Sequence, residues 1–223
     1  MRGSFSTGRD LALVAVFAAL IAALSLTPGI PLGAGVPLTL QTLGVGLAGL
    51  VLGPWRGFLA VLLYVVVGLA GLPVFAGGAS GLGTLAGPTV GYLVSFPVMA
   101  LVAGLIARWT VRRGQSWAVG KLIVAALVAS LLINHPAGIA GLVANAHLSW
   151  GVAVVTDLAF VPGDVVKGVL AGLVAAVVHR AFPALLAAGC GHGDGSRGSS
   201  RMTQGEKQTM PGEPSPQQGE TPE

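Results

Sequence analysis

Residues 37–72 read PLTLQTLGVGLAGLVLGPWRGFLAVLLYVVVGLAGL. Two apolar runs, 37–53 and 56–72, meet at the short segment GPWRG, residues 53–57. Each run approaches the roughly 20 apolar residues that a membrane-spanning helix needs. Because so short a link leaves room only for a tight turn, the stretch predicts two antiparallel membrane helices.

The composition of the whole chain agrees with a membrane protein. It is 53% hydrophobic and only 9% charged, whereas soluble domains carry roughly 25% charged residues. We interpret the first apolar run as a membrane helix and not as a cleaved signal peptide, because equally apolar runs follow it and no convincing cleavage site does. The predicted fold class is an all-α integral membrane protein with six transmembrane helices. Their predicted spans are 10–27, 37–53, 56–72, 87–108, 120–143 and 163–182.

Two connections between these helices are apolar but irregular. Residues 73–91 read PVFAGGASGLGTLAGPTVG, and residues 144–162 read ANAHLSWGVAVVTDLAFVP. Irregular backbone at membrane depth is tolerated only where protein or a cavity surrounds it. We therefore expect both glycine-rich or broken loops to fold over the outer face, the alternative being free extramembrane loops. The predicted domains are a membrane domain, 1–188, and a disordered polar tail, 189–223, rich in Gly, Ser, Pro, Gln and Glu.

The positive charges predict the orientation. With the N-terminus in the cytoplasm, 11 of the 12 Lys and Arg residues fall on the inner side and only Lys167 on the outer side. Such an asymmetry is the usual one for membrane proteins and places both termini in the cytoplasm. It also excludes nucleic acid as a partner, because these cations flank membrane spans and form no groove-sized patch.

Asp164 and Lys167 are the outstanding ionisable pair in the membrane portion. Ionisable residues within spans are costly and are functional candidates by default. Their spacing of three places both on one helix face, and Val161-Pro162-Gly163 before them predicts a helix start near Asp164. Two interpretations stay open. Asp164 caps the helix and pairs with Lys167, or the lysine faces a ligand carboxylate while the aspartate accepts N–H donors.

Other polar residues lie at the same predicted level. Thr39 and Gln41 open the second helix, where Gln41 either binds a ligand or joins two helices by a hydrogen bond. Tyr92 opens the fourth helix, where it either stacks on a ring or lies in the interfacial aromatic belt. Asn134-His135-Pro136 interrupts the fifth helix, and we interpret it as a kink and not as a ligand site.

Motifs for catalysis and metal binding are missing. No two histidines stand at i and i+4, the single cysteine Cys190 has no partner, and neither G-x-S-x-G nor a P-loop occurs. We therefore predict neither an enzyme nor a metal or cofactor site, and any ATP-driven transport would need another chain.

The first helix carries alanines at intervals of four, at Ala15, Ala19 and Ala23. Small residues at this spacing give a smooth face that allows close helix packing, either against another protein or against the remaining helices.

Four segments resemble the BioY family, the biotin-binding S components of energy-coupling-factor transporters. In chain order they read VPLTLQTLGVGLAGLVLGPWRG, LLYVVVGLAGLPVFAGG, GLGTLAGPTVGYLVSFP and FVPGDVVKGVLAGLVAA. The resemblance covers about residues 10–182 and rests on the T-x-Q, G-L-P-V-F, G-P-T-x-G-Y and P-G-D-x-x-K elements in combination.

The resemblance implies capture of biotin without chemistry, in the plasma membrane of a prokaryote. It implies docking through Ala15, Ala19 and Ala23 on a transmembrane coupling (T) protein, driven by a pair of cytoplasmic ABC-type ATPases. The expected substrate-binding residues are, by these motifs, Thr39, Gln41, Phe75, Gly87, Tyr92, Asp164 and Lys167. Where some relatives carry a polar side chain after G-L-P-V-F, this chain has only Ser80, which leaves that contact to backbone groups or removes it.

Two other classes remain open from the sequence. One is an S component for another vitamin, such as thiamine or riboflavin. The other is a non-transport membrane protein, either an intramembrane enzyme or a structural subunit.

Overall fold

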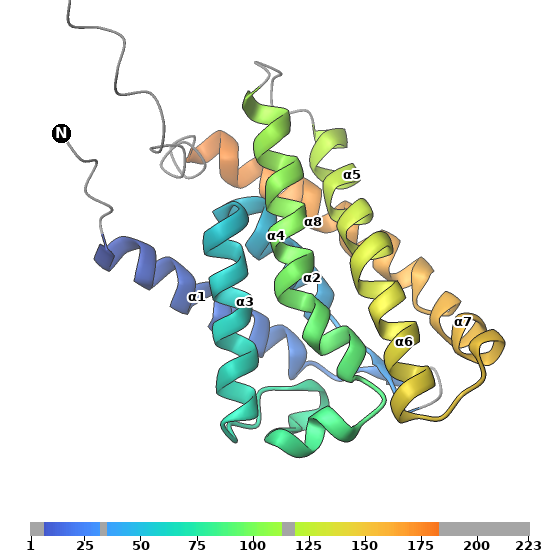
Figure 1. The fold of residues 1–223 in the computed structure, drawn as a ribbon. Helices are drawn as coiled ribbons and strands as arrows, with labels where there is room; N and C mark the ends of the chain where they lie inside the picture. Colours follow the sequence, from blue (N-terminus) through green and yellow to red (C-terminus); the bar gives the residue numbers. More distant parts are fainter. Residues whose placement is uncertain (1–6, 32–34, 113–118, 183–223) are drawn as a thin grey trace, which may run out of the picture. The chain divides into compact units, whose positions relative to one another are not determined.

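The computed structural model describes residues 7–31, 35–112 and 119–182, and these are mostly helical (Figure 1). The predicted polar tail, 189–223, lies outside the described residues. In chain order the elements are α1 Thr7–Ser25, β1 Ile30–Pro31, β2 Pro37–Leu38, α2 Gln41–Leu52, α3 Pro54–Leu69, η1 Ala76–Gly78, η2 Leu82–Ala86, α4 Val90–Arg112, α5 Val119–Ala129, η3 Ser130–Asn134, α6 His135–Asn145, α7 Trp150–Leu158 and α8 Val161–Ala181.

Four helical segments are long and apolar enough to cross a membrane. They correspond to the predicted first, fourth, fifth and sixth spans and comprise Gly8–Ser25, Val90–Trp109, Val119–Asn145 and Val161–Ala181. The prediction of a multi-pass helical membrane protein is therefore confirmed.

The predicted second and third spans are helices, but both are shorter than expected. Residues 37–38 belong to β2, which pairs antiparallel with β1, so α2 begins only at Gln41 and has 12 residues. α3 has 16 residues and ends at Leu69 instead of continuing to residue 72. The turn between them is tighter than the five-residue link suggested. Gly53, at φ 82°, ends α2, and Pro54 directly begins α3, where its missing N–H costs no hydrogen bond.

Two further departures concern the second half of the chain. The expected interruption at Asn134-His135-Pro136 is a single π-helical turn, η3, which joins α5 to α6 without breaking the helix. Residues 144–162, expected as an irregular loop, contain the nine-residue helix α7. Periodicity alone did not reveal α7, because its polar residue Asp157 is buried instead of facing outward.

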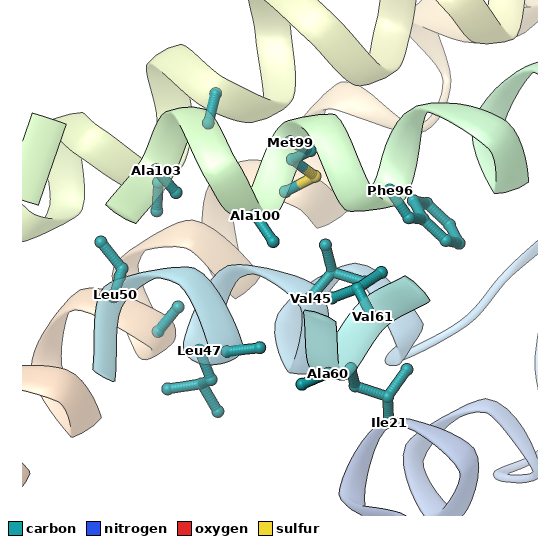
Figure 2. Packing of buried hydrophobic residues seen from close by; sticks show 14 of the residues in the cluster. Ile21, Val45, Leu47, Leu50, Ala60, Val61, Phe96, Met99, Ala100 and Ala103 are labelled. Atoms are coloured by element: carbon teal, nitrogen blue, oxygen red, sulfur yellow. The ribbon is translucent and has the colours of Figure 1, made fainter. Parts of the chain in front are cut away.

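Helix α2 is the most enclosed element, and it packs against α1, α3, α4 and α8. Figure 2 shows Val45 and Leu50 of α2 facing Met99, Ala100 and Ala103 of α4. A side chain at Gly49 would place its Cβ about 3.1 Å or less from the Ala100 backbone, which allows only glycine at this closest approach. Since lipid offers no hydrophobic drive for helices to associate, such close backbone contact is a main source of packing energy.

The two ends of the helices differ. The α2–α3 turn and the C-terminal end of α4 lie at one end, while residues 70–89 and the β1–β2 pair lie at the other (Figure 1). At the first end, Arg56 of α3 forms an ion pair of 3.0 Å with Asp10 of α1.

Candidate ligand-binding site

A cavity of about 220 Å³ lies at the end that carries residues 70–89. Side chains from α2, α4 and α8 form its walls together with the segments before α2 and before α4. Its lining residues are Gly35, Val36, Pro37, Leu38, Thr39, Gln41, Thr42, Phe75, Ala76, Ala79, Thr84, Pro88, Thr89, Tyr92, Leu93, Phe96, Asn134, Phe160, Asp164 and Lys167. Most of these are apolar or aromatic, with a few convergent polar groups, as is typical of small-molecule sites.

A buried polar triangle forms one wall of this cavity. Lys167 Nζ lies 2.7 Å from Asp164 Oδ1 and 3.0 Å from Thr42 Oγ1. The Thr42 hydroxyl in turn donates to the same Asp164 oxygen at 2.9 Å. Asp164 and Lys167 are each 7% exposed, so this ion pair is shielded from solvent, where an unpaired charge would be strongly disfavoured.

The local sequence explains how α8 places this pair, and it corrects one of our two interpretations. α8 begins at Val161, three residues earlier than predicted, because Pro162 fits a first helical turn. The N-cap position belongs to Phe160 and has no side-chain capping bond. Asp164 therefore does not cap the helix, and its carboxylate turns instead toward Thr42 and Lys167.

A second polar layer lies behind the triangle. The His135 ring contacts two acids, with Nδ1 at 2.8 Å from Asp157 Oδ2 and Nε2 at 3.4 Å from Asp164 Oδ2. Tyr92 donates from its hydroxyl to Asp157 Oδ1 at 2.7 Å. The sequence predicts a kink at His135 and marks it as an ionisable group, but no spacing rule joins residue 135 to residues 157 and 164. The one available signal was that all three are ionisable groups in apolar segments.

Gln41 belongs to a separate set of hydrogen bonds in the wall of the cavity. Its Nε2 donates to the Tyr64 hydroxyl at 2.6 Å, and that hydroxyl donates to the Val74 carbonyl at 3.1 Å. Ser25, the last residue of α1, also donates to the Val74 carbonyl. Gln41 thus joins two helices, as one of its two interpretations required, and it also lines the cavity.

Two aromatic side chains rest on glycines. Phe75 packs on Gly68 and meets the Tyr64 ring edge-on at 5.5 Å between centroids. The Tyr92 ring packs on Gly138, where a Cβ would overlap it. These glycines let the two rings approach the backbones of α3 and α6 closely.

Some of the remaining predicted residues line the cavity, and others do not. Thr39 lines the cavity, whereas Gly87 does not; its neighbours Pro88 and Thr89 do. Ser80 does not line it either, and the nearby Thr84 supplies the polar side chain of that segment. The alanines of α1 lie apart from the cavity. All three are exposed along one face of the helix: Ala15, Ala19 and Ala23.

Metal-ligating side chains do not gather within residues 7–31, 35–112 and 119–182 in any group of three or more His, Cys, Asp or Glu residues suited to an ion.

Comparison with known protein families gives a match over residues 1–184 to the model described as the BioY family. The chain belongs to the BioY family. This confirms the resemblance found in the four sequence segments, and it extends over every described residue.

Named relatives of this BioY chain agree. The biotin transporter BioY of Rhodobacter capsulatus is 47% identical over 191 residues, which cover 81% of this chain and 99% of the relative. The biotin transporter BioY of Rhizobium etli is 43% identical over 180 residues, covering 79% and 96%. A crystal structure of the S-component for biotin from an ECF-type ABC transporter matches with a TM-score of 0.75 and 25% identity, covering 81% of this chain and 95% of that one.

These relatives indicate the functional class of this chain. The family and its named members are transporters, so this BioY chain is a multi-pass transport protein of the plasma membrane and not an enzyme. A non-transport membrane protein, one of the classes that the sequence left open, is not favoured.

The buried ion pair generates a prediction about stability. Asp164→Asn or Lys167→Met alone leaves one charge buried without its partner, and we expect each to lower the free energy of unfolding by about 3–5 kcal/mol. The double variant removes both charges, so it should be more stable than either single variant. Arg180→Met, which removes an exposed cation at the far end of α8, controls for loss of positive charge. Thermal unfolding in detergent measures all four, and strictly additive losses would show that the pair is not coupled.

Proposed function

We propose that this protein is the biotin-binding S component of an energy-coupling-factor transporter. It captures biotin in the cavity between α2, α4 and α8 and presents it to an ATP-driven coupling module. The observation that carries this proposal is the buried pair Asp164 and Lys167 in the wall of an otherwise apolar and aromatic cavity. The named relatives, transporters of biotin, support the choice of ligand over thiamine or riboflavin.

The chemistry of biotin suits such a cavity. The molecule has a cyclic urea with two N–H donors and one carbonyl, an apolar bicycle, and a valerate chain that ends in a carboxylate. Phe75, Phe96 and Phe160 offer apolar surface to the bicycle. Gln41 uses its amide nitrogen on Tyr64, which leaves its carbonyl oxygen, within the described chain, as an acceptor for an N–H donor.

Lys167 is proposed to bind the carboxylate. An ammonium group has three N–H bonds, and two of them point to Asp164 and Thr42. Among the residues that the structure describes, the third has no acceptor, and we propose that it binds the ligand. Because the urea and the carboxylate stand at opposite ends of biotin, Asp164 at 2.7 Å from Lys167 is better suited to holding the lysine than to binding the urea at the same time.

The proposed role of Lys167 predicts a loss of biotin affinity when this residue is replaced. Lys167→Ala removes a charge-assisted hydrogen bond worth about 1.5–3 kcal/mol, so biotin affinity should fall roughly ten- to a hundredfold. Biotin amide, which lacks the negative charge, should bind the wild type more weakly than biotin and lose much less with Lys167→Ala. Isothermal titration of both ligands against both proteins measures this coupling. If the variant keeps the wild-type ratio of acid to amide affinity, Lys167 does not face the carboxylate.

The proposed topology has six membrane crossings, with α2 and α3 as short ones, both termini in the cytoplasm, and the cavity toward the outside. The positions of the cations Arg9, Arg56, Arg108, Lys121 and Arg180 at helix ends remote from the cavity support it. A twelve-residue helix spans only about 18 Å, so α2 depends on its surrounding helices to shield its ends.

Impermeant thiol labelling of intact cells tests this orientation. In a Cys190→Ser background, Ser80→Cys should react from outside and Arg113→Cys only after the membrane is opened. The reverse pattern would contradict the proposed orientation, and labelling of the background protein measures nonspecific reaction.

The proposed partners are a transmembrane coupling protein and two cytoplasmic ATPases, with α1 as the docking surface. Ala15, Ala19 and Ala23 are exposed and small, so another helix can approach the α1 backbone closely there. The S-component relative from an ECF-type transporter supports this type of assembly.

The proposed docking surface is tested by enlarging one side chain of the alanine face. Ala19→Trp should weaken co-purification with an energy-coupling-factor coupling protein, because the large ring holds the helix backbones apart, while biotin binding to the isolated protein should persist. Leu20→Trp, on the adjacent exposed position of α1, is the matched control and should have the smaller effect. Equal effects of the two variants would show that the alanine face has no special role.

A further inference from the structure

His135 lies next to the cavity without lining it. It begins α6 directly after the π turn η3, and it is 4% exposed. Its two ring nitrogens face Asp157 of α7 and Asp164 of α8, at 2.8 and 3.4 Å. The imidazole of His135 therefore joins Asp164, which lines the cavity, to Asp157, which contacts the lining residue Tyr92.

This geometry favours a doubly protonated ring. A neutral imidazole carries one N–H, so one of its nitrogens would aim a lone pair at a carboxylate oxygen. An imidazolium presents an N–H to both acids. The Asp157 contact has the length of a charge-assisted hydrogen bond, whereas Nε2 forms no well-aligned hydrogen bond within the described chain. The attraction between Nε2 and Asp164 is therefore mainly electrostatic.

The ionisable groups on the elements around His135 include Tyr92, Lys167 and Lys121. From α4, Tyr92 donates to the second oxygen of Asp157. From α8, Lys167 contacts the other oxygen of Asp164. Lys121, the third residue of α5, stands 14 positions before His135 in the sequence, so most of that helix separates it from the cluster.

With both acids ionised, the charges of this cluster balance when the ring is protonated. Asp157 and Asp164 contribute two negative charges, and Lys167 with a protonated His135 contributes two positive charges. With a neutral His135 the buried cluster would carry a net charge of −1. At low effective dielectric such a charge repels an incoming anion over several ångströms.

We propose that His135 is a positioning residue whose protonated ring bridges Asp157 and Asp164 and keeps this buried cluster electrically neutral, so that the cavity accepts an anionic ligand. The inference rests on the proposed function, in which biotin carboxylate is that anion. It explains why a second acid and a histidine are buried behind a pair that could neutralise itself.

Charge compensation tests the proposal. His135→Asn keeps an amide that can donate to Asp157 but removes the positive charge, and it should weaken biotin binding about tenfold or more. Adding Asp157→Asn removes the surplus negative charge. The double variant should therefore recover to within about threefold of the wild type. A structural role for His135 predicts the opposite, namely that the double variant binds no better than His135→Asn.

The control is His147→Asn, the same substitution at the exposed position just beyond α6, which should bind biotin as the wild type does. Melting temperatures of all variants identify any that fail to fold. Nitrogen NMR of the wild-type histidine rings gives a measurement that needs no folded variant at position 135. At about pH 7.5, both His135 nitrogens should carry protons in the biotin-free protein, and a neutral tautomer would overturn the proposal.

The outcomes separate this inference from the proposed function. If the wild type fails to bind biotin, the proposed function is wrong. If the wild type binds biotin but the double variant shows no recovery, or the ring is neutral, only the role of His135 is wrong.

Discussion

A lysine and an aspartate buried together at membrane depth constrain much of this structure. Separating the two charges would leave each one buried without its nearest partner of opposite sign, and α2 brings Thr42 against both. The same contact gives the cavity its one concentrated polar wall. The protein thus maintains a charged group beside an apolar chamber, which is the arrangement needed to recognise an amphipathic anion.

Small residues make this arrangement possible. Glycines let α2 approach α4, and they let the rings of Phe75 and Tyr92 pack closely on neighbouring helices. The polar groups are then held by rigid, closely packed elements instead of by mobile loops. A hydrogen-bonded chain through Gln41, Tyr64 and Val74 also connects the cavity wall to Ser25 at the end of α1. The binding site and the proposed docking helix therefore belong to one packed unit.

Local patterns predicted part of this structure well. Four apolar runs became membrane-length helices, and the three-residue spacing of Asp164 and Lys167 correctly placed them together. Contacts between distant segments were beyond local patterns. His135 meets Asp157 and Asp164 across 22 and 29 positions of sequence, and nothing periodic marks such a meeting. The two short helices were overestimated because hydropathy does not register where a β pair or a positive-φ glycine ends a helix.

Direct titration of the purified wild-type protein with biotin, and in parallel with thiamine and riboflavin, tests the central claim most directly. Our account predicts saturable binding of one biotin per protein at micromolar or lower concentration, with no comparable binding of the other two vitamins. Absence of biotin binding by folded protein, or tight binding of thiamine or riboflavin in its place, would contradict it.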